Sequence, residues 1–258
     1  MKKTTKRISE KIANYIFLFM AIIAVVSVLA ITLYMFLKGA PAILRVGAPE
    51  LLFGSVWKPT AAEPHFGIAF IILSSIIGTL GAVLIGVPVG LLTAVFLTDI
   101  TSSSEKGRRI SRVLSSAVEL LAAIPSVIYG LIGLMVLNPL MYKLEKVVFA
   151  GDSSHQFTGG ANLLSAIIVL AIMILPTVIN VSCSSIRAVP DSMRHASLAL
   201  GASKLQTIFK VVIPAAKSGI MTGVVLGIGR ALGEAMAINM VAGGAVNMPL
   251  PFNSVRFL

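Results

Sequence analysis

The sequence contains one cysteine, Cys183, and three histidines, at positions 65, 155 and 195. A single thiol cannot form a disulfide within the chain, and scattered histidines do not supply the closely spaced ligands of a zinc site. We therefore expect no redox centre, no metal site and no cofactor.

Charged residues are also scarce, at 12% of the chain, whereas hydrophobic residues make up 57%. An ordinary soluble domain has about 25% charged residues, so the composition predicts an integral membrane protein surrounded by lipid. The net charge of +11 could suit nucleic acid. Most cations, however, lie in short segments beside apolar runs, which is how membrane topology is encoded, and we expect no nucleic-acid partner.

Five apolar runs are long enough to cross a bilayer, which takes about 20 residues. They cover roughly 14–37, 68–98, 113–137, 162–186 and 218–242. The predicted fold is an all-α integral membrane protein, a polytopic helical bundle with five spans. The first run follows basic residues as a signal peptide does, but its apolar stretch is too long for one, so we interpret it as a retained anchor.

The distribution of Lys and Arg predicts the orientation. Fourteen lie in the tail at 1–13 and in the segments 99–112 and 187–217, and six lie in the segments on the opposite side. By the positive-inside rule the amino terminus is cytosolic and the protein lies in the cytoplasmic membrane. Residues 14–67 then form the first span and an ordered external loop, 138–161 form a second external loop, and Leu258 lies outside.

The basic segment 187–217 is too long and too apolar for a simple connector. It keeps Leu198, Leu205, Ile208 and Phe209 among cations, the composition of an amphipathic helical unit. Gly201 is placed to end one short helix and turn the chain into the next. We expect this segment to dock onto a cytosolic protein.

Three ionisable residues fall within predicted spans: Glu119, Arg230 and Glu234. Charges at that depth are costly and are candidates for function. On a continuous helix, Arg230 and Glu234 share a face with glycines at which a partner subunit's helix could form the other wall of a pathway, namely Gly219, Gly223 and Gly227. Either the pair neutralises itself within the bundle, or it lines a path for an anion.

In the third run, Pro125 is expected to break the helix between Glu119 and Ser126. Backbone groups freed at membrane depth are tolerated where they are buried or line a cavity. The stretch 122–130 is therefore either a packing kink or the border of a pathway.

The segment 187–217 resembles the permease signature of ATP-binding-cassette importers: Glu-Ala-Ala, three residues, Gly, nine residues, then Ile-x-Leu-Pro. Here it runs His195-Ala196-Ser197, Gly201, and then Val211-Val212-Ile213-Pro214. In that family the segment forms coupling helices that sit in a cleft of the cytosolic ATPase. The resemblance implies that ATPase coupling involves Arg194, His195, Ala196, Ser197, Gly201, Ile213 and Pro214.

Two further stretches, 122–130 and 229–237, together with 53–59, look like the PstC-type permease of the phosphate importer. The resemblance extends from about residue 15 to 245. It implies a MetI-like transmembrane domain at 68–258 and a phosphate pathway with four residues, Arg230, Glu234, Glu119 and Ser126. It also implies a PstB-like ATP-binding subunit, a PstA-like second permease and an extracytoplasmic PstS-like phosphate-binding protein.

The sequence departs from the family in two places. His195 stands where the family usually has Glu, which removes a carboxylate from the coupling segment. Family members typically have six spans, whereas this chain ends at Leu258 shortly after the fifth. We therefore expect the last span to be missing, and a truncated, inactive permease is one alternative.

Phosphate suits an Arg–Glu pair because near neutral pH it still carries a proton, which it can donate to a carboxylate while accepting from a guanidinium. Sulfate cannot donate a proton, although a sulfate or molybdate permease stays open as an alternative.

A membrane enzyme would need a cluster of nucleophile, base or metal ligands, which the sequence lacks. Residues 201–204 also lack the spacing of a phosphate-binding loop, so a separate subunit must hydrolyse ATP. A channel or passive scaffold would not need the coupling segment.

Overall fold

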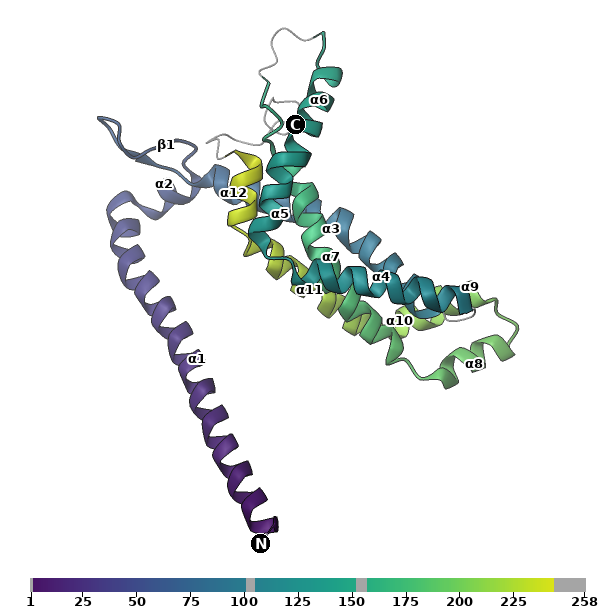
Figure 1. Cartoon of the computed structure of the whole chain (residues 1–258). Helices are drawn as coiled ribbons and strands as arrows, with labels where there is room; N and C mark the ends of the chain where they lie inside the picture. The colour runs from purple at the N-terminus through teal and green to yellow at the C-terminus, as the bar shows by residue number, and fades with distance from the viewer. Residues whose placement is uncertain (1, 101–104, 152–156, 244–258) are drawn as a thin grey trace. The chain divides into compact units, whose positions relative to one another are not determined.

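The computed structural model describes residues 2–100, 105–151 and 157–243 (Figure 1). It consists of helices and a single two-stranded hairpin, which confirms the predicted all-α class. The chain divides into two compact units, Met1–Ala69 and Phe70–Leu258. Leu258 and part of the predicted loop 138–161 lie outside the described residues.

The first unit begins with one long helix, α1 (Lys2–Val46). Its stretch Lys11–Val46 is long and apolar enough to cross a membrane, and its apolar side chains are exposed around the whole circumference. A lone helix that is hydrophobic all round suits lipid rather than water. The predicted first span is thus confirmed, and the helix extends beyond both of its predicted ends.

After α1 the chain forms a structured connector, although residues 39–46 of the predicted loop 39–67 belong to α1. It contains α2 (Ala48–Phe53), β1 (Trp57–Lys58) and β2 (His65–Phe66). The strands pair antiparallel, with Trp57 opposite Phe66 and their rings edge to face at 6.0 Å. Next to the hairpin, Gly54 and Gly67 touch so closely that a Cβ on Gly67 would lie 2.2 Å from the Gly54 carbonyl carbon, so neither position has room for a side chain.

The second unit starts with α3 (Ala69–Val95), which runs into a π-helical turn, η1 (Phe96–Ile100). The elements that follow up to the central helix are α4 (Glu105–Ala123), α5 (Ser126–Ile132), η3 (Gly133–Leu137), α6 (Asn138–Val148) and α7 (Leu163–Arg187). The remainder are α8 (Asp191–Ala199), α9 (Lys204–Thr207), η4 (Ile208–Val212), α10 (Ile213–Ala215), α11 (Lys217–Leu232) and α12 (Met236–Ala242).

Helix α7 is the centre of this unit, because most of its side chains are buried and both α3 and α11 pack on it. Small residues allow the close approach of α3. A Cβ on Gly86 would lie 2.7 Å from Ile174 Cδ1, and one on Gly90 would lie 2.8 Å from Val178 Cγ1. Replacing either glycine would push the two helices apart.

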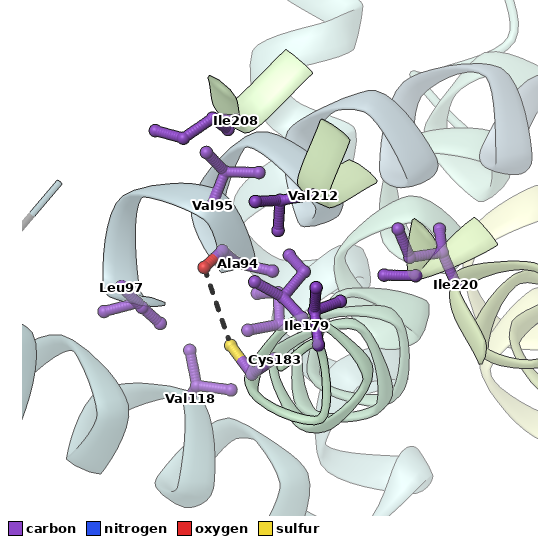
Figure 2. Close-up of a cluster of buried hydrophobic side chains, with 12 residues drawn as sticks. Ala94, Val95, Leu97, Val118, Ile179, Cys183, Ile208, Val212 and Ile220 are labelled. Carbon is purple, nitrogen blue, oxygen red and sulfur yellow. Dashed lines mark hydrogen bonds between the residues drawn. The ribbon is translucent and has the colours of Figure 1, made fainter. Parts of the chain in front are cut away.

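A buried apolar cluster joins the end of α3 to α7, η4 and the start of α11 (Figure 2). Figure 2 shows Ala94 and Val95 facing Ile179, Cys183 and Val212. The Cys183 thiol points at the Ala94 carbonyl oxygen, 3.8 Å away. The second half of the segment 187–217 is therefore packed into the bundle, whereas α8 has no buried residue.

The third predicted span, 113–137, is wrong in its position. Helix α4 ends at Ala123, and the apolar helix long enough to span is Ser126–Val148. The predicted loop 138–161 is accordingly helical up to Val148. Pro139 does not end the helix, because it occupies the first turn of α6, where no backbone N–H is required. The Asn138 amide donates to the Val241 carbonyl at 3.1 Å.

The fifth predicted span, 218–242, is not one continuous helix. Helix α11 ends at Leu232 and α12 begins at Met236. Within the described ranges, four helices are long and apolar enough to cross a membrane. A fifth span is reached only by joining Lys204–Ala215 to Lys217–Leu232, two helices bent by 70°.

Candidate pathway and coupling segment

The predicted break at Pro125 is confirmed. Helix α4 ends two residues earlier, Pro125 is extended at φ −60° and ψ 143°, and α5 begins at Ser126. A break leaves carbonyl groups at the end of α4 without helical partners. The buried Tyr129 bridges the break, since its hydroxyl donates at 2.7 Å to the Leu121 carbonyl, which also accepts from the Ile124 N–H at 3.3 Å.

A second break lies at residues 233–235, between α11 and α12. Glu234 lies within it, and its Oε1 accepts a hydrogen bond of 3.0 Å from the Ala237 backbone N–H. The carboxylate thereby caps the first turn of α12. The prediction that Arg230 and Glu234 lie one turn apart on a continuous helix is wrong. Glycine followed by a capping acid was the signal that could have revealed it.

The two breaks lie side by side, because α12 packs on α5 (Figure 1). A Cβ on Gly130 of α5 would lie 3.0 Å from Ala237 Cα. Tyr129, Ala237 and Val241 share one buried cluster with side chains of α7. The chain thus places two non-helical stretches of backbone next to each other within its apolar helices, which is tolerated where they are buried or line a cavity.

Arg230 and Glu234 approach this junction from α11 and from the second break. Both are half-buried. None of the ion pairs among the described residues joins them. Arg230 lies in the last turn of α11, directly before the second break, and Tyr129 lies in α5 just after the first. The structure therefore gathers an arginine, a carboxylate and a tyrosine around the paired breaks.

The other two predicted pathway residues lie on the α4–α5 side. Ser126 is half-buried as the first residue of α5, directly after Pro125. Glu119 is exposed on the last turns of α4, near the break but not buried.

The glycines of α11 do not face a partner subunit, which corrects the sequence-based interpretation. A Cβ on Gly219 would lie 2.1 Å from Ser185 Oγ, and one on Gly223 would lie 3.1 Å from Val181 Cβ. Gly227 is similarly close to Val178. This face therefore packs on α7 of the same chain. Small-residue spacing indicates a close helical neighbour without saying which one.

The segment 187–217 has the predicted form, a short helix followed by a second before Pro214. Helix α8 ends at Ala199 and Gly201 adopts a left-handed conformation, with φ +86°. Two backbone N–H groups at this turn donate to carbonyls in the last turn of α8. The Gly201 N–H donates to the Leu198 carbonyl at 3.0 Å, and the Ala202 N–H donates to the Ser197 carbonyl at 3.2 Å. Ser203 and Gln206 then form a capping box that starts α9.

Most of the predicted coupling residues lie on the surface of this segment. His195, Ala196, Gly201 and Pro214 are exposed. Leu200 is 89% exposed and supplies an apolar patch at the turn. Two predicted residues are internal: the Ser197 hydroxyl lies 2.9 Å from that of Thr207, and Ile213 packs against the cluster of Figure 2.

Arg194 differs from its neighbours because it points into the protein. Its guanidinium forms an ion pair with Asp99 of η1 and donates to the Ile186 carbonyl of α7 at 2.9 Å. Sequence reasoning missed Asp99, which was assigned to a loop. The signal was an acid directly after a long apolar run, which needs a cation if it is buried.

These features define a class: a polytopic helical membrane protein with paired helix breaks beside an arginine and a largely exposed segment of short helices at 187–217. Residues 86–254 match the family of binding-protein-dependent transport system inner membrane components. The chain belongs to this family and is a multi-pass inner-membrane permease.

Two relatives identified by sequence agree with this assignment. The chain is 38% identical over 241 residues to the probable ABC transporter permease protein YqgH of Bacillus subtilis, covering 92% of this chain and 73% of that protein. It is 34% identical over 209 residues to the phosphate transport system permease protein PstC of Pasteurella multocida, covering 78% and 63%. A solved structure of the MetNI methionine ABC transporter in an inward-facing conformation matches with a TM-score of 0.48 and 18% identity, covering 74% of this chain and 81% of that chain.

Proposed function

We propose that this chain is the transmembrane permease subunit of an ATP-driven importer of inorganic phosphate. The observation that carries the proposal is the position of Arg230 and Glu234 at the paired helix breaks. The name of the Pasteurella relative supports phosphate as the solute.

The chemistry of the two side chains fits a partly protonated anion. The Arg230 guanidinium offers several N–H donors to the phosphate oxygens. Glu234 uses Oε1 to hold the start of α12, and its second oxygen accepts the phosphate proton. An arginine at this depth is strongly disfavoured without a negative partner, so an anion passing through is attracted to it.

Three partner subunits complete the proposed complex. A separate cytosolic ATP-binding subunit, PstB-like, receives α8 and the exposed turn at Gly201 and hydrolyses the ATP. A PstA-like second permease forms the other half of the pathway, and a PstS-like extracytoplasmic binding protein delivers phosphate. The amino terminus and the segment 187–217 face the cytosol, because they belong to the cation-rich side.

Transport by the reconstituted complex tests the identity of the substrate directly. Vesicles that contain this chain and its partner subunits should take up radiolabelled phosphate only when ATP is supplied. Excess unlabelled phosphate should compete, whereas sulfate and molybdate should not, because neither has a proton to donate. Uptake of sulfate with comparable efficiency would assign the chain to another oxyanion.

A further inference from the structure

Helix α8 is attached to the rest of the protein with little apolar packing. None of its residues is buried, although Val189 just before it is. A nine-residue helix is too short to be stable on its own in water. Its position must therefore depend on a small number of polar links.

The strongest of these links is the ion pair between Arg194 and Asp99. The Arg194 side chain is 19% exposed and that of Asp99 is 8% exposed. The second terminal nitrogen of Arg194 donates to the Ile186 carbonyl in the last turn of α7. One guanidinium therefore connects α8 to the ends of two long helices, α3 through η1 and α7.

The acceptor side of the link is itself held in place. The Thr98 hydroxyl lies 3.1 Å from Asp99 Oδ2 and 2.9 Å from the Ala94 carbonyl. The Ser111 hydroxyl of α4 donates to the Leu97 carbonyl at 3.2 Å. Ala94 and Leu97 belong to the buried cluster of Figure 2. Asp99 is thus fixed to a rigid part of the bundle.

From this arrangement we propose that Asp99 and Arg194 are positioning residues that fasten α8 to the ends of α3 and α7 and so present the helix to the ATP-binding subunit. The inference rests on the proposed function for the identity of that partner. It changes the role expected for Arg194, which acts inside this chain rather than at the subunit contact. Asp99 is too deeply buried to touch a partner, so any effect it has on docking must pass through α8.

Hydrogen exchange of the peptide 191–199 in the purified complex measures the fastening. Asp99→Asn and Arg194→Gln should each accelerate exchange about tenfold, because a charge-assisted link to a marginal helix is lost. The double variant should exchange no faster than either single variant, since both remove the same link. Asp191→Asn is the matched control: its carboxylate is 84% exposed and 3.7 Å from Arg194 Nε, and exchange should stay near the parent rate.

Affinity for the co-expressed ATP-binding subunit measures whether α8 is held in the position that the subunit binds. Asp99→Asn should weaken binding about tenfold, and Arg194→Lys should retain more affinity than Arg194→Gln because it keeps the charge. An exchange rate in Asp99→Asn within twofold of the parent rate would show that the ion pair does not hold α8 in place. Faster exchange with unchanged affinity would show a purely structural pair and overturn the positioning role. Neither measurement needs a transported solute, so both outcomes are independent of whether the substrate is phosphate.

Discussion

Gly130 of α5 lies against Ala237 of α12, so that a Cβ on the glycine would come within 3.0 Å of the Ala237 Cα. This contact joins the two helices that follow the breaks. It also explains why residues more than 100 positions apart can form one candidate pathway.

Gly130→Val should destabilise this junction by about 1–3 kcal/mol, because the added methyl groups meet both the Met240 Sδ and the α12 backbone at the Ala237 Cα, and the backbone cannot move aside. Thermal unfolding of the protein in detergent would measure the loss. Gly229→Val is the control, since nothing lies within 4 Å of a Cβ on Gly229. Equal unfolding temperatures for the two variants would show that α5 and α12 do not pack as described.

Gly201→Val should uncouple transport from ATP hydrolysis. The turn there needs φ +86°, which costs a β-branched residue roughly 1–2 kcal/mol, although the site itself has open space. The ratio of phosphate transported to ATP hydrolysed would measure the effect. Gly201→Asn should be milder, because asparagine tolerates the left-handed region. A normal ratio in the valine variant would remove the coupling role from this turn.

The orientation can be read by labelling single cysteines in a Cys183→Ala background. A cysteine at Leu200 should react with an impermeant maleimide only from the cytosolic side, and one at Val147 only from the outside. Both positions are highly exposed, at 89% and 76%. Reaction of the Leu200 variant from outside would invert the assigned topology.

Glu145 is a buried acid that sequence reasoning did not single out. It is 1% exposed and accepts hydrogen bonds from the Thr158 N–H at 2.9 Å and the Thr158 hydroxyl at 3.1 Å. Glu145→Ala should lower stability by about 1–3 kcal/mol, because Thr158 loses its acceptors. The exposed Glu105→Ala is the comparison, and an equally small change in unfolding temperature for both would contradict the anchoring role.

Features governed by local sequence were predictable. Apolar length revealed most of the spans, Pro125 revealed one break, and Gly201 revealed the turn between the short helices, because each acts on its own backbone. The third span was placed too early, because the helix that follows Pro125 continues through Pro139 to Val148.

Features set by distant contacts could not be predicted. Asp99 and Arg194 are separated by 95 positions, so no spacing rule connects them. The spacing of Gly219, Gly223 and Gly227 in α11 predicts a close helical neighbour, but only the fold identifies that neighbour as α7. The second break was hidden because residues 218–242 are apolar enough to be interpreted as one span, and the capping by Glu234 becomes visible only once α12 has a separate start.

Arg230→Gln removes the charge that we propose contacts the anion in the pathway. Phosphate uptake is measured in vesicles that contain the assembled complex, with Arg112→Gln as control because Arg112 is exposed on α4. We predict that Arg230→Gln assembles with its partner subunits yet loses phosphate uptake by at least about 100-fold, since the polar side chain remains and the charge does not, while Arg112→Gln transports like the parent. Uptake by Arg230→Gln at the parent rate, or a loss explained by failed assembly, would contradict the account.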